Sequence, residues 1–445
     1  MAVPHAQNPA GAISFQVLFG ISERRQENTG CHWAGGLHDG TTVKVVIAPN
    51  AFKGTLAAVE VARAIADGMH ELHPEWEIVE VPMADGGDGT VEAVLAALPG
   101  RRISVAVKSP LLADTTADFA VLDDGKTAVI EMAQASGLTV VAEEQRNPLV
   151  TTTYGTGQLV RRAIEERCRK VFIGIGGSAT VDGGAGMAAA LGVRFLDDTG
   201  REIPFGGGGL ARLDRIDVSR RVDLSGIEIR ALSDVTNPLL GENGAARVFA
   251  PQKGATPEMV EELERNLARL SEVIKRDLGV DVAEIPGAGA AGGLGAGIVA
   301  FLNGKIVPGI DAVIDLVSLR DKVRGADLVI TGEGSFDSQT SGGKAPLGVA
   351  GTAREFGVPS VLICGRLEEE SRETAEGLFF AVLILTELAG SQREAILNPK
   401  RYLNLAVARF LADHPPPWPR IFPHAPVRSY GGCDCSVSLK AGERR

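Results

Sequence analysis

The chain of 445 residues is long enough for about two to four domains, each able to bury its own hydrophobic core. Its 56 acidic residues outnumber its 45 basic ones, and the net charge of -11 argues against a nucleic-acid partner, whose phosphates are bound by basic surfaces. No apolar run approaches the roughly 20 residues of a membrane-spanning helix, so we expect no membrane partner. The five cysteines lack metal-binding spacing, which favours reduced thiols in a cytoplasmic protein.

The two ends of the chain lack the apolar periodicity of packed elements. Residues 1–42 contain prolines and mixed polar residues without a continuous apolar core. Three consecutive prolines at 415–417 stop any helix at the other end, because proline cannot continue one. We therefore expect residues 1–42 and 414–445 to be disordered extensions.

Between these ends, strand patterns alternate with helix patterns. Residues 44–48 form a short buried-type strand, and apolar side chains then recur at steps of four and three over 58–72, as in an amphipathic helix. Further strands are predicted over 78–81, 171–175, 229–232, 327–331 and 360–363, and further helices over 90–98, 185–191, 259–278 and 347–355. This alternation predicts mostly parallel sheets covered by helices on both faces.

The stretch 103–132 departs from the alternation. Short strand patterns at Val105, 119–122 and 128–131 follow one another with no helix between them. Consecutive strands without crossover helices pair antiparallel, so this stretch indicates a second domain with a mixed sheet.

Five glycine-rich loops carry most of the residues that could perform chemistry. They span 48–54, 84–90, 174–186, 233–245 and 331–344. Ligands of open α/β sheets bind beyond the carboxyl ends of strands, where such loops lie. In the first loop, Lys53 could meet a phosphate or carboxylate, or could be a solvated loop lysine.

The second and fourth loops hold carboxylates. Asp85, among glycines before a helix, could bind a metal-bridged phosphate or a hydroxyl, or could belong to an Asp-Gly turn with a helix cap. Asp234 and Asn237 are candidates for metal or hydroxyl contacts. The alternative for the fourth loop is a turn closed by Asn237 and Pro238.

The third loop is the most informative. The backbone N–H groups of Gly176, Gly177 and Ser178 could hold an anion, either a phosphate or a carboxylate. A weak dinucleotide fingerprint beginning at Gly174 keeps a nicotinamide-dependent oxidoreductase as an alternative function. Asp182, surrounded by glycines, is better interpreted as a chemical group than as a helix cap.

The fifth loop supplies Glu333, Asp337 and Lys344, two acids and a cation. It is not a P-loop, because Ala345 follows Lys344 where a P-loop has Ser or Thr. A further glycine run at 286–297 could contact phosphate or could allow close backbone packing, and packing is favoured. Together, the loops fit phosphoryl transfer: carboxylates for a metal, backbone donors for phosphates, lysines for developing charge and an acid as base.

The order and spacing of these loops resemble the type I glycerate kinases. The resemblance rests on APNAFKGTL, PMADGGDGTVEA, NPLVTTTYGTGQL, IGIGGSATVDGGAGM, SDVTNPLLGENGA, FAPQKGA, PGAGAAGGLGAG and VITGEGSFDSQTSGGKAPLGVA, and it covers residues 44 to about 411. It implies two α/β domains: a first, mostly parallel one (43–84 and 286–413) and a mixed-sheet second one (85–285) inserted into it. The active site is then expected in the cleft between them.

The resemblance also implies an activity, the transfer of the ATP γ-phosphoryl group to D-glycerate with Mg²⁺. The usual bacterial product is 2-phosphoglycerate, with 3-phosphoglycerate as the alternative. ATP and glycerate are the expected partners, and homo-oligomer formation is left open. A non-catalytic regulator that binds a sugar acid is a further alternative.

Family motif positions carry over onto eight residues, whose roles follow from their chemistry. They are Lys53, Asp85, Asp182, Asp234, Asn237, Glu333, Asp337 and Lys344. Either Asp182 or Asp337 is expected to take the hydroxyl proton, Lys53 and Lys344 to neutralise charge, and Asp234 or Glu333 to help hold Mg²⁺. The chain departs from the family pattern at Asn50 and Ala51, where members often have an acid and a hydroxyl, and at Asp88, where Glu is common.

Overall fold

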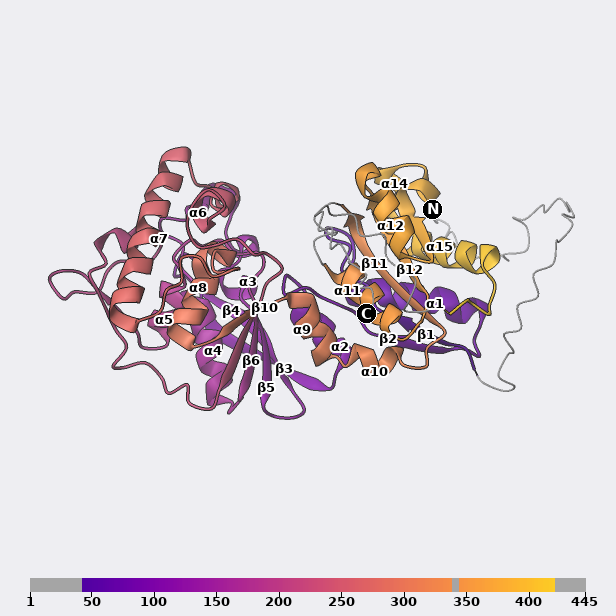
Figure 1. The fold of residues 1–445 in the computed structure, drawn as a ribbon, viewed down its shortest axis with the longest axis horizontal. Coiled ribbons are helices and arrows are strands. Elements are labelled where there is room, and N and C mark those ends of the chain that lie inside the picture. The colour runs from indigo at the N-terminus through magenta and orange to yellow at the C-terminus, as the bar shows by residue number, and fades with distance from the viewer. Residues whose placement is uncertain (1–41, 338–343, 421–445) are drawn as a thin grey trace, which may run out of the picture. The chain divides into compact units, whose positions relative to one another are not determined.

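The computed structural model describes residues 42–337 and 344–420, whose strands form two large sheets (Figure 1). The first sheet consists of β1 (Lys44–Ile47), β2 (Glu77–Glu80), β11 (Leu328–Phe336), β12 (Ser360–Leu367) and β13 (Ala381–Ile384). Its order is β13-β12-β11-β1-β2, and every neighbouring pair is parallel. The chain leaves β1 toward β2 on one side, whereas β11, β12 and β13 extend on the other. The strand order therefore reverses between β1 and β11.

The second sheet has six strands and a mixed arrangement. It consists of β3 (Gly100–Lys108), β4 (Asp114–Leu122), β5 (Thr127–Glu131), β6 (Lys170–Gly174), β9 (Glu228–Leu232) and β10 (Lys305–Val307). Strands β5, β6, β9 and β10 pair parallel, whereas β3, β4 and β5 pair antiparallel. The predicted antiparallel character of the stretch 103–132 is thus confirmed. A separate antiparallel pair is formed by β7 (Arg194–Leu196) and β8 (Arg215–Asp217).

The second sheet is inserted into the first along the chain. Strands β1 and β2 precede it, and β11 to β13 follow it. Strand β10 pairs with β9 through Lys305–Arg230 and Val307–Leu232, beyond the domain boundary predicted at residue 285. We therefore propose that the inserted part continues to about β10, and the precise division into domains stays a proposal.

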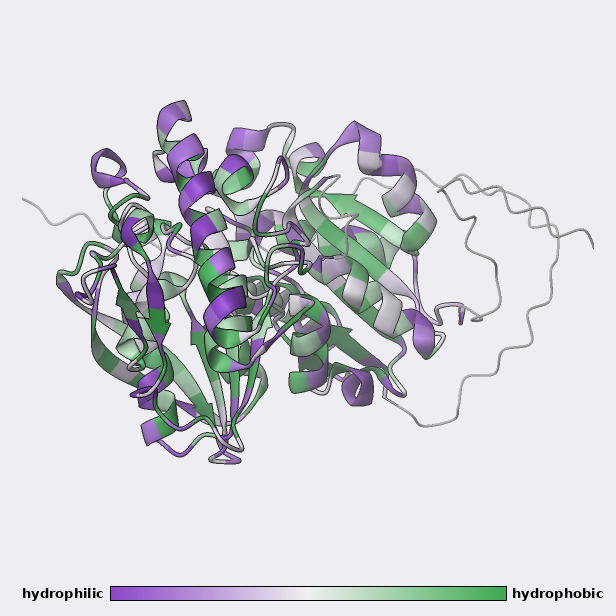
Figure 2. Ribbon diagram, turned by 60° about the vertical axis from the view of Figure 1, so that its left-hand side comes forward, coloured by the Kyte–Doolittle hydropathy of each residue, from purple (hydrophilic) through white to green (hydrophobic). Residues whose placement is uncertain are grey.

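Helices flank both sheets (Figure 1). The chain forms α1 (Ala58–Leu72), α2 (Thr90–Ala97), α3 (Ala133–Ser136), α4 (Tyr154–Glu165), α5 (Ala185–Ala190), α6 (Ala245–Phe249), α7 (Pro257–Leu278), α8 (Ala290–Leu302), α9 (Gly309–Leu316), α10 (Leu319–Val323), α11 (Ala345–Glu355), α12 (Arg372–Leu378), α13 (Leu385–Ala389), α14 (Gln392–Leu397) and α15 (Pro399–Asp413). The strands are mostly green in Figure 2, whereas many turns of the surrounding helices are purple. Helices thus cover the apolar faces of the strands, as an α/β fold requires.

Strand β1 shows why the first sheet is covered on both faces. Successive side chains of a strand point to opposite faces, so Val45 and Ile47 join one core while Val46 joins another. The first of these cores contains apolar residues of α1 and α15, and the second contains residues of α9 and α11. The consecutive aliphatic residues of β1 are therefore explained by its burial on both faces, as is typical of a parallel strand.

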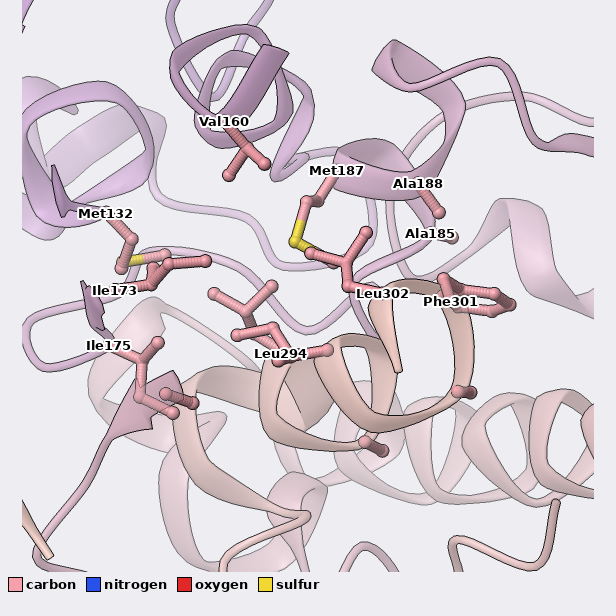
Figure 3. Close-up of a cluster of buried hydrophobic side chains, with 14 of the residues drawn as sticks. Met132, Val160, Ile173, Ile175, Ala185, Met187, Ala188, Leu294, Phe301 and Leu302 are labelled. Carbon is pink, nitrogen blue, oxygen red and sulfur yellow. The ribbon is translucent and has the colours of Figure 1, made fainter. Parts of the chain in front are cut away.

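The core around the second sheet includes α5 and α8. In Figure 3, Leu294, Phe301 and Leu302 of α8 lie beside Met187 of α5 and Ile173 of β6. Glycines let α8 approach this closely: a Cβ on Gly292 would lie 2.0 Å from the carbonyl oxygen of Thr180. The glycine run at 286–297 thus serves backbone packing, the interpretation that the sequence favoured.

The residues just after α15 are packed, contrary to the disordered tail predicted from residue 414. Trp418 is only 7% exposed, its ring centroid lies 5.6 Å from that of Trp76, and its indole N–H donates a 2.9 Å hydrogen bond to the carbonyl of His414. Arg420 donates to the carbonyl of Ala326 at 2.8 Å. Apolar contact by a single Trp leaves no periodic pattern, so the sequence did not reveal it. Residues 1–41 and 421–445 lie outside the described residues.

Two further findings concern the described residues. The cysteines among them, Cys168 and Cys364, are buried and form no disulfide. Within residues 42–337 and 344–420, no helix is both long enough and apolar enough to cross a membrane.

Candidate active site

The loops that follow β1 and β11 lie at the point where the strand order of the first sheet reverses. Such a point is where ligands of open α/β sheets bind. The Asn50 N–H donates a 2.8 Å hydrogen bond to the carbonyl of Gly332, which extends the β1–β11 pairing into the loop. A Cβ on Gly334 would lie 3.1 Å from the backbone nitrogen of Lys53, so the loop after β1 packs closely against the C-terminal part of β11. This contact holds Lys53, which is exposed, beside β11.

The second and third glycine-rich loops pack backbone against backbone. The Gly176 N–H donates a 3.1 Å hydrogen bond to the carbonyl of Gly86. A Cβ on Gly176 would lie 2.8 Å from the Cα of Gly87, and a Cβ on Gly174 would lie 2.5 Å from the Gly86 oxygen. Only glycine tolerates such an approach. The glycines therefore bring Asp85 close to the loop that contains Ser178, and the Gly176 N–H is already used in doing so.

Asp85 and Asp234 form a pair of neighbouring carboxylates. Asp234 Oδ1 accepts a 2.9 Å hydrogen bond from the Gly309 N–H at the start of α9. Burial, and then the charge of Asp85, raise the pKa of Asp234 to about 7, although the N–H groups of Gly309 and Ile310 and the charge of Lys344 oppose the shift. A carboxylate with its pKa raised in this way, beside a second carboxylate, is poised to accept a cation or a proton.

Two adjoining cavities open at these loops. The first has a volume of about 770 Å³ and the second about 540 Å³, within the range of roughly 300–1,000 Å³ typical of ligand sites. Their common wall consists of Asn50, Ala51, Phe52, Lys53, Gly54, Thr55, Asp85 and Lys344. The two cavities could therefore hold two ligands that meet at this shared wall.

Most of the residues that the sequence singled out line one or both cavities. Lys53, Asp85 and Lys344 line both. The first cavity adds Gly176, Gly177, Ser178 and Asp234, and the second adds Glu333 and Asp337. Five loops that are far apart in the sequence thus converge, and residues 338–343 of the fifth loop lie outside the described residues.

The fifth loop places its acids beside Lys344. Lys344 Nζ lies 4.0 Å from Asp337 Oδ1, and both side chains are 25% exposed. Strand β11 continues to Phe336, beyond the strand predicted over 327–331, so Glu333 lies within the strand. Glu333 is 7% exposed and lines the second cavity. Charges held so close in a partly buried site interact more strongly than they would in water.

Asp182 lies away from both cavities and has a structural environment. Its side chain is 1% exposed and accepts hydrogen bonds from the hydroxyls of Thr152 and Thr153 and from the N–H groups of Thr153, Gly184 and Gly186. Burial raises the pKa of Asp182, and these donors oppose the shift. A carboxylate surrounded by donors inside the protein holds its loop in place and does not face a ligand.

Asn237 likewise lies outside the residues lining the two cavities. Its Nδ2 donates a 2.8 Å hydrogen bond to the carbonyl of Asn243. This contact connects the two ends of the loop 237–243.

Lys253 is a residue of the first cavity that sequence reasoning did not select. It lies in the short 3-10 turn Pro251–Lys253, is 1% exposed and donates a 2.6 Å hydrogen bond to Ser178 Oγ. The only sequence signal for it was its place in the motif FAPQKGA. Lys253 lies outside the five glycine-rich loops, and its partner Ser178 is 75 residues away in the sequence.

The acidic side chains at the two cavities can be compared with the ligands that Mg²⁺ requires. Among the described residues, no group of three or more His, Cys, Asp or Glu side chains forms a metal site. Mg²⁺ in phosphoryl-transfer sites, however, is usually held by one or two carboxylates together with substrate phosphates. The pair Asp85 and Asp234, in which each charge disfavours the other, fits that requirement.

The weak dinucleotide fingerprint does not have the structure that it would need. A Rossmann fingerprint opens directly into a helix after its glycines. Here the chain turns through Gly177 at a φ of 73° and reaches α5 only at Ala185. The oxidoreductase alternative therefore loses its structural basis.

Comparison with known proteins identifies the family. A sequence model described as the glycerate kinase family matches residues 45–413. The chain is 50% identical over 325 residues to a glycerate kinase of Halalkalibacterium halodurans, spanning 73% of this chain and 85% of that protein. It is 50% identical over 329 residues to the glycerate 2-kinase of Escherichia coli (strain K12), spanning 74% and 86%. A crystal structure of a candidate glycerate kinase 2 from Salmonella typhimurium LT2 matches with a TM-score of 0.74 at 44% identity, over 84% of this chain and 99% of that one. The chain belongs to the glycerate kinase family.

Proposed function

We propose that this kinase transfers the γ-phosphoryl group of ATP to a hydroxyl of D-glycerate and forms 2-phosphoglycerate. The observation that supports this most directly is the wall shared by the two cavities, which carries Lys53, Asp85 and Lys344. A transferase for two substrates needs two adjoining sites with charge-stabilising groups where they meet. The 50% identity to a protein named glycerate 2-kinase supports the choice of hydroxyl. The product 3-phosphoglycerate is the alternative.

The second cavity suits the nucleotide. Beyond the shared wall it is lined by Leu385, Ala395, Ile396 and Pro399, with Thr386 and Gln392 among them. An apolar surface with a few polar groups is typical of a site for a planar base. With the base there, the phosphates of ATP would extend to the shared wall and D-glycerate would occupy the first cavity.

Lys53 and Lys344 are proposed to neutralise charge on the transferring group. Lys53 is exposed and Lys344 is partly exposed, so both can reach a ligand at the shared wall. The phosphoryl-transfer transition state spreads negative charge over its equatorial oxygens, and cations aimed at them lower the barrier. Asp337, near Lys344 in the second cavity, would hold that lysine in place.

Asp85 and Asp234 are the residues that would hold Mg²⁺. When bound, Mg²⁺ neutralises phosphate charge and orients the phosphates. A carboxylate of this pair that is not bound to the metal could orient the acceptor hydroxyl and take its proton, for which a pKa near neutrality is suited. The buried donors around Asp182, one of the two bases expected from the sequence, argue against it for this step, whereas Asp337 stays a candidate.

The product of the reaction tests the proposed hydroxyl. Purified protein is incubated with ATP, D-glycerate and Mg²⁺, and the phosphorylated acid is examined by phosphorus NMR with proton coupling. A phosphate on the secondary hydroxyl couples to one proton and identifies 2-phosphoglycerate, whereas coupling to two protons would identify 3-phosphoglycerate.

A further inference from the structure

The first cavity continues past the shared wall to a buried cation. Lys253 Nζ donates a 2.6 Å hydrogen bond to Ser178 Oγ and a 2.8 Å hydrogen bond to the carbonyl of Thr180. Both acceptors belong to the third glycine-rich loop, and Ser178 is 5% exposed. Lys253 lines the first cavity but not the second.

We propose that Lys253 is a positioning residue that makes the turn Gly177–Ser178 a binding site for the carboxylate of the acceptor. The inference rests on the proposed function, since it names the group that distinguishes D-glycerate from other alcohols. It assigns the carboxylate to the end of the first cavity that lies beyond the shared wall.

The hydrogen bonds of the loop support this assignment. A serine oxygen that accepts from an ammonium keeps its own O–H available to donate, so Lys253 directs Ser178 toward a ligand that accepts. The Gly176 N–H is used by the Gly86 carbonyl, whereas within the described residues the N–H groups of Gly177 and Ser178 donate to no other group. Gly177 has a φ of 73°, and successive N–H groups in such a turn form a concavity for an anion.

The three lysines of the first cavity divide into two kinds, and this favours a carboxylate over a phosphate. Lys53 and Lys344 are accessible and line both cavities, as a cation that follows a transferring phosphoryl group requires. Lys253 is 1% exposed and is fixed by two hydrogen bonds. A fixed single charge behind a small turn matches a single carboxylate, whereas a polyphosphate needs several accessible cations.

The charged form of Lys253 depends on the anions around this lysine. Burial lowers the pKa of Lys253 to about 7, and Asp182 is the charged group that opposes this shift. Asp182 already accepts from hydroxyl and N–H donors of Thr153 and Gly186, so its own charge is spread over these contacts. An anion bound at Ser178 would favour the charged form of the lysine and gain from it.

The test measures binding of each substrate separately. Lys253→Met removes the charge and keeps a long apolar side chain, Ser178→Ala removes the hydroxyl, and Lys275→Met changes an exposed lysine of α7 outside both cavities. D-glycerate and a non-hydrolysable ATP analogue are titrated by calorimetry. Lys253→Met and Ser178→Ala should each weaken D-glycerate binding by at least about tenfold, as expected for loss of a charge-assisted contact. Binding of the ATP analogue should change less than about twofold, and Lys275→Met should change neither.

Two further readouts separate positioning from general damage. The double variant should bind D-glycerate about as weakly as either single variant, because Lys253 acts through Ser178. The preference of kcat/KM for D-glycerate over glycerol, which lacks the carboxylate, should fall by about tenfold or more in Lys253→Met. Should that variant fail to fold, Ser178→Ala carries the same expectations.

Unchanged D-glycerate binding, or equal weakening of both ligands, would overturn the inference. Wild-type protein that binds D-glycerate but transfers no phosphoryl group would remove the proposed function and leave the carboxylate site. If the wild-type protein phosphorylates D-glycerate and both Lys253→Met and Ser178→Ala bind D-glycerate as the wild type does, the carboxylate site alone is ruled out. Failure of the wild type to bind D-glycerate would remove both.

Discussion

Asp234 and the backbone N–H of Gly309 are joined by a hydrogen bond of 2.9 Å, although 75 residues separate them in the sequence. Gly309 begins α9, immediately after the chain leaves the second sheet through β10. A Cβ on Gly309 would lie 2.0 Å from the backbone carbonyl oxygen of Asp85, so the start of α9 also packs closely against the backbone of Asp85. The start of α9 therefore positions the Asp234 carboxylate next to Asp85 and stabilises the charge of Asp234.

Asp234→Asn should lower kcat by about 10² or more while the protein remains folded. The amide oxygen can still accept from Gly309, but the variant loses the charge that would serve Mg²⁺ or the hydroxyl proton. Steady-state kinetics with varied Mg²⁺ measures the loss, and thermal unfolding checks the fold. Asp311→Asn, an exposed position in the first turn of the same helix, is the matched control and should keep full turnover. Equal activity of both variants would show that Asp234 has no part in the reaction.

Lys53→Ala should lower kcat at least as much as it raises KM. A cation aimed at a transferring phosphoryl group acts mainly in the transition state, and Lys53 lines both cavities. Initial rates with each substrate varied separate the two effects. Lys126→Ala, in the exposed turn between β4 and β5, should change neither constant. An unchanged kcat with only a raised KM would mean that Lys53 contributes to ground-state binding alone.

Asp182→Asn should mainly reduce stability. The amide keeps one acceptor oxygen and replaces the other with an NH2 donor, so some of the buried N–H and O–H groups of Thr153, Gly184 and Gly186 lose their acceptor. Breaking such a buried charged network costs about 3–5 kcal/mol, measurable by urea unfolding. Asp223→Asn, at an exposed turn, should stay within about 0.5 kcal/mol of the wild type. A 10²-fold loss of kcat in folded Asp182→Asn, without loss of stability, would instead make Asp182 a catalytic base.

Truncation after Asp413 should destabilise the protein relative to truncation after Arg420. The shorter form loses Trp418, whose ring packs on Trp76 and lies 6.1 Å from the ring of Phe410. Removal of a buried Trp typically costs about 3–5 kcal/mol. Urea unfolding of both truncations and of Trp418→Ala compares the tail with the single side chain. If all three unfold at the wild-type midpoint, the packing of Trp418 contributes nothing.

Local sequence patterns predicted the elements well because their causes are local. The strand over 44–48 and the helix over 58–72 follow from consecutive aliphatic residues and from helical spacing, and both are found within a residue of the predicted ends. The mixed sheet followed in the same way from strands without intervening helices. Trp418 was missed because one buried ring creates no period.

The candidate site was predictable only in part, since its contacts connect distant loops. Asp85 and Asp234 were selected by their glycine-rich loops, and the same rule selected Asp182, which the hydroxyls of Thr152 and Thr153 keep in the interior. Nothing in the loop itself shows that threonines about 30 residues earlier surround this aspartate. Lys253, in contrast, lines the first cavity but was not selected from the sequence. No local pattern marks a lysine whose partner is 75 residues away.

The proposed phosphorylation of D-glycerate is tested most directly by measuring D-glycerate-dependent release of ADP by the purified 445-residue chain in the presence of ATP and Mg²⁺. A coupled assay follows ADP while D-glycerate is added to or withheld from otherwise identical reactions. The proposed function predicts that ADP release requires D-glycerate, saturates as the D-glycerate concentration rises and yields an equal amount of phosphoglycerate. A rate no higher than that of the reaction without D-glycerate, from folded protein with Mg²⁺ present, would contradict it.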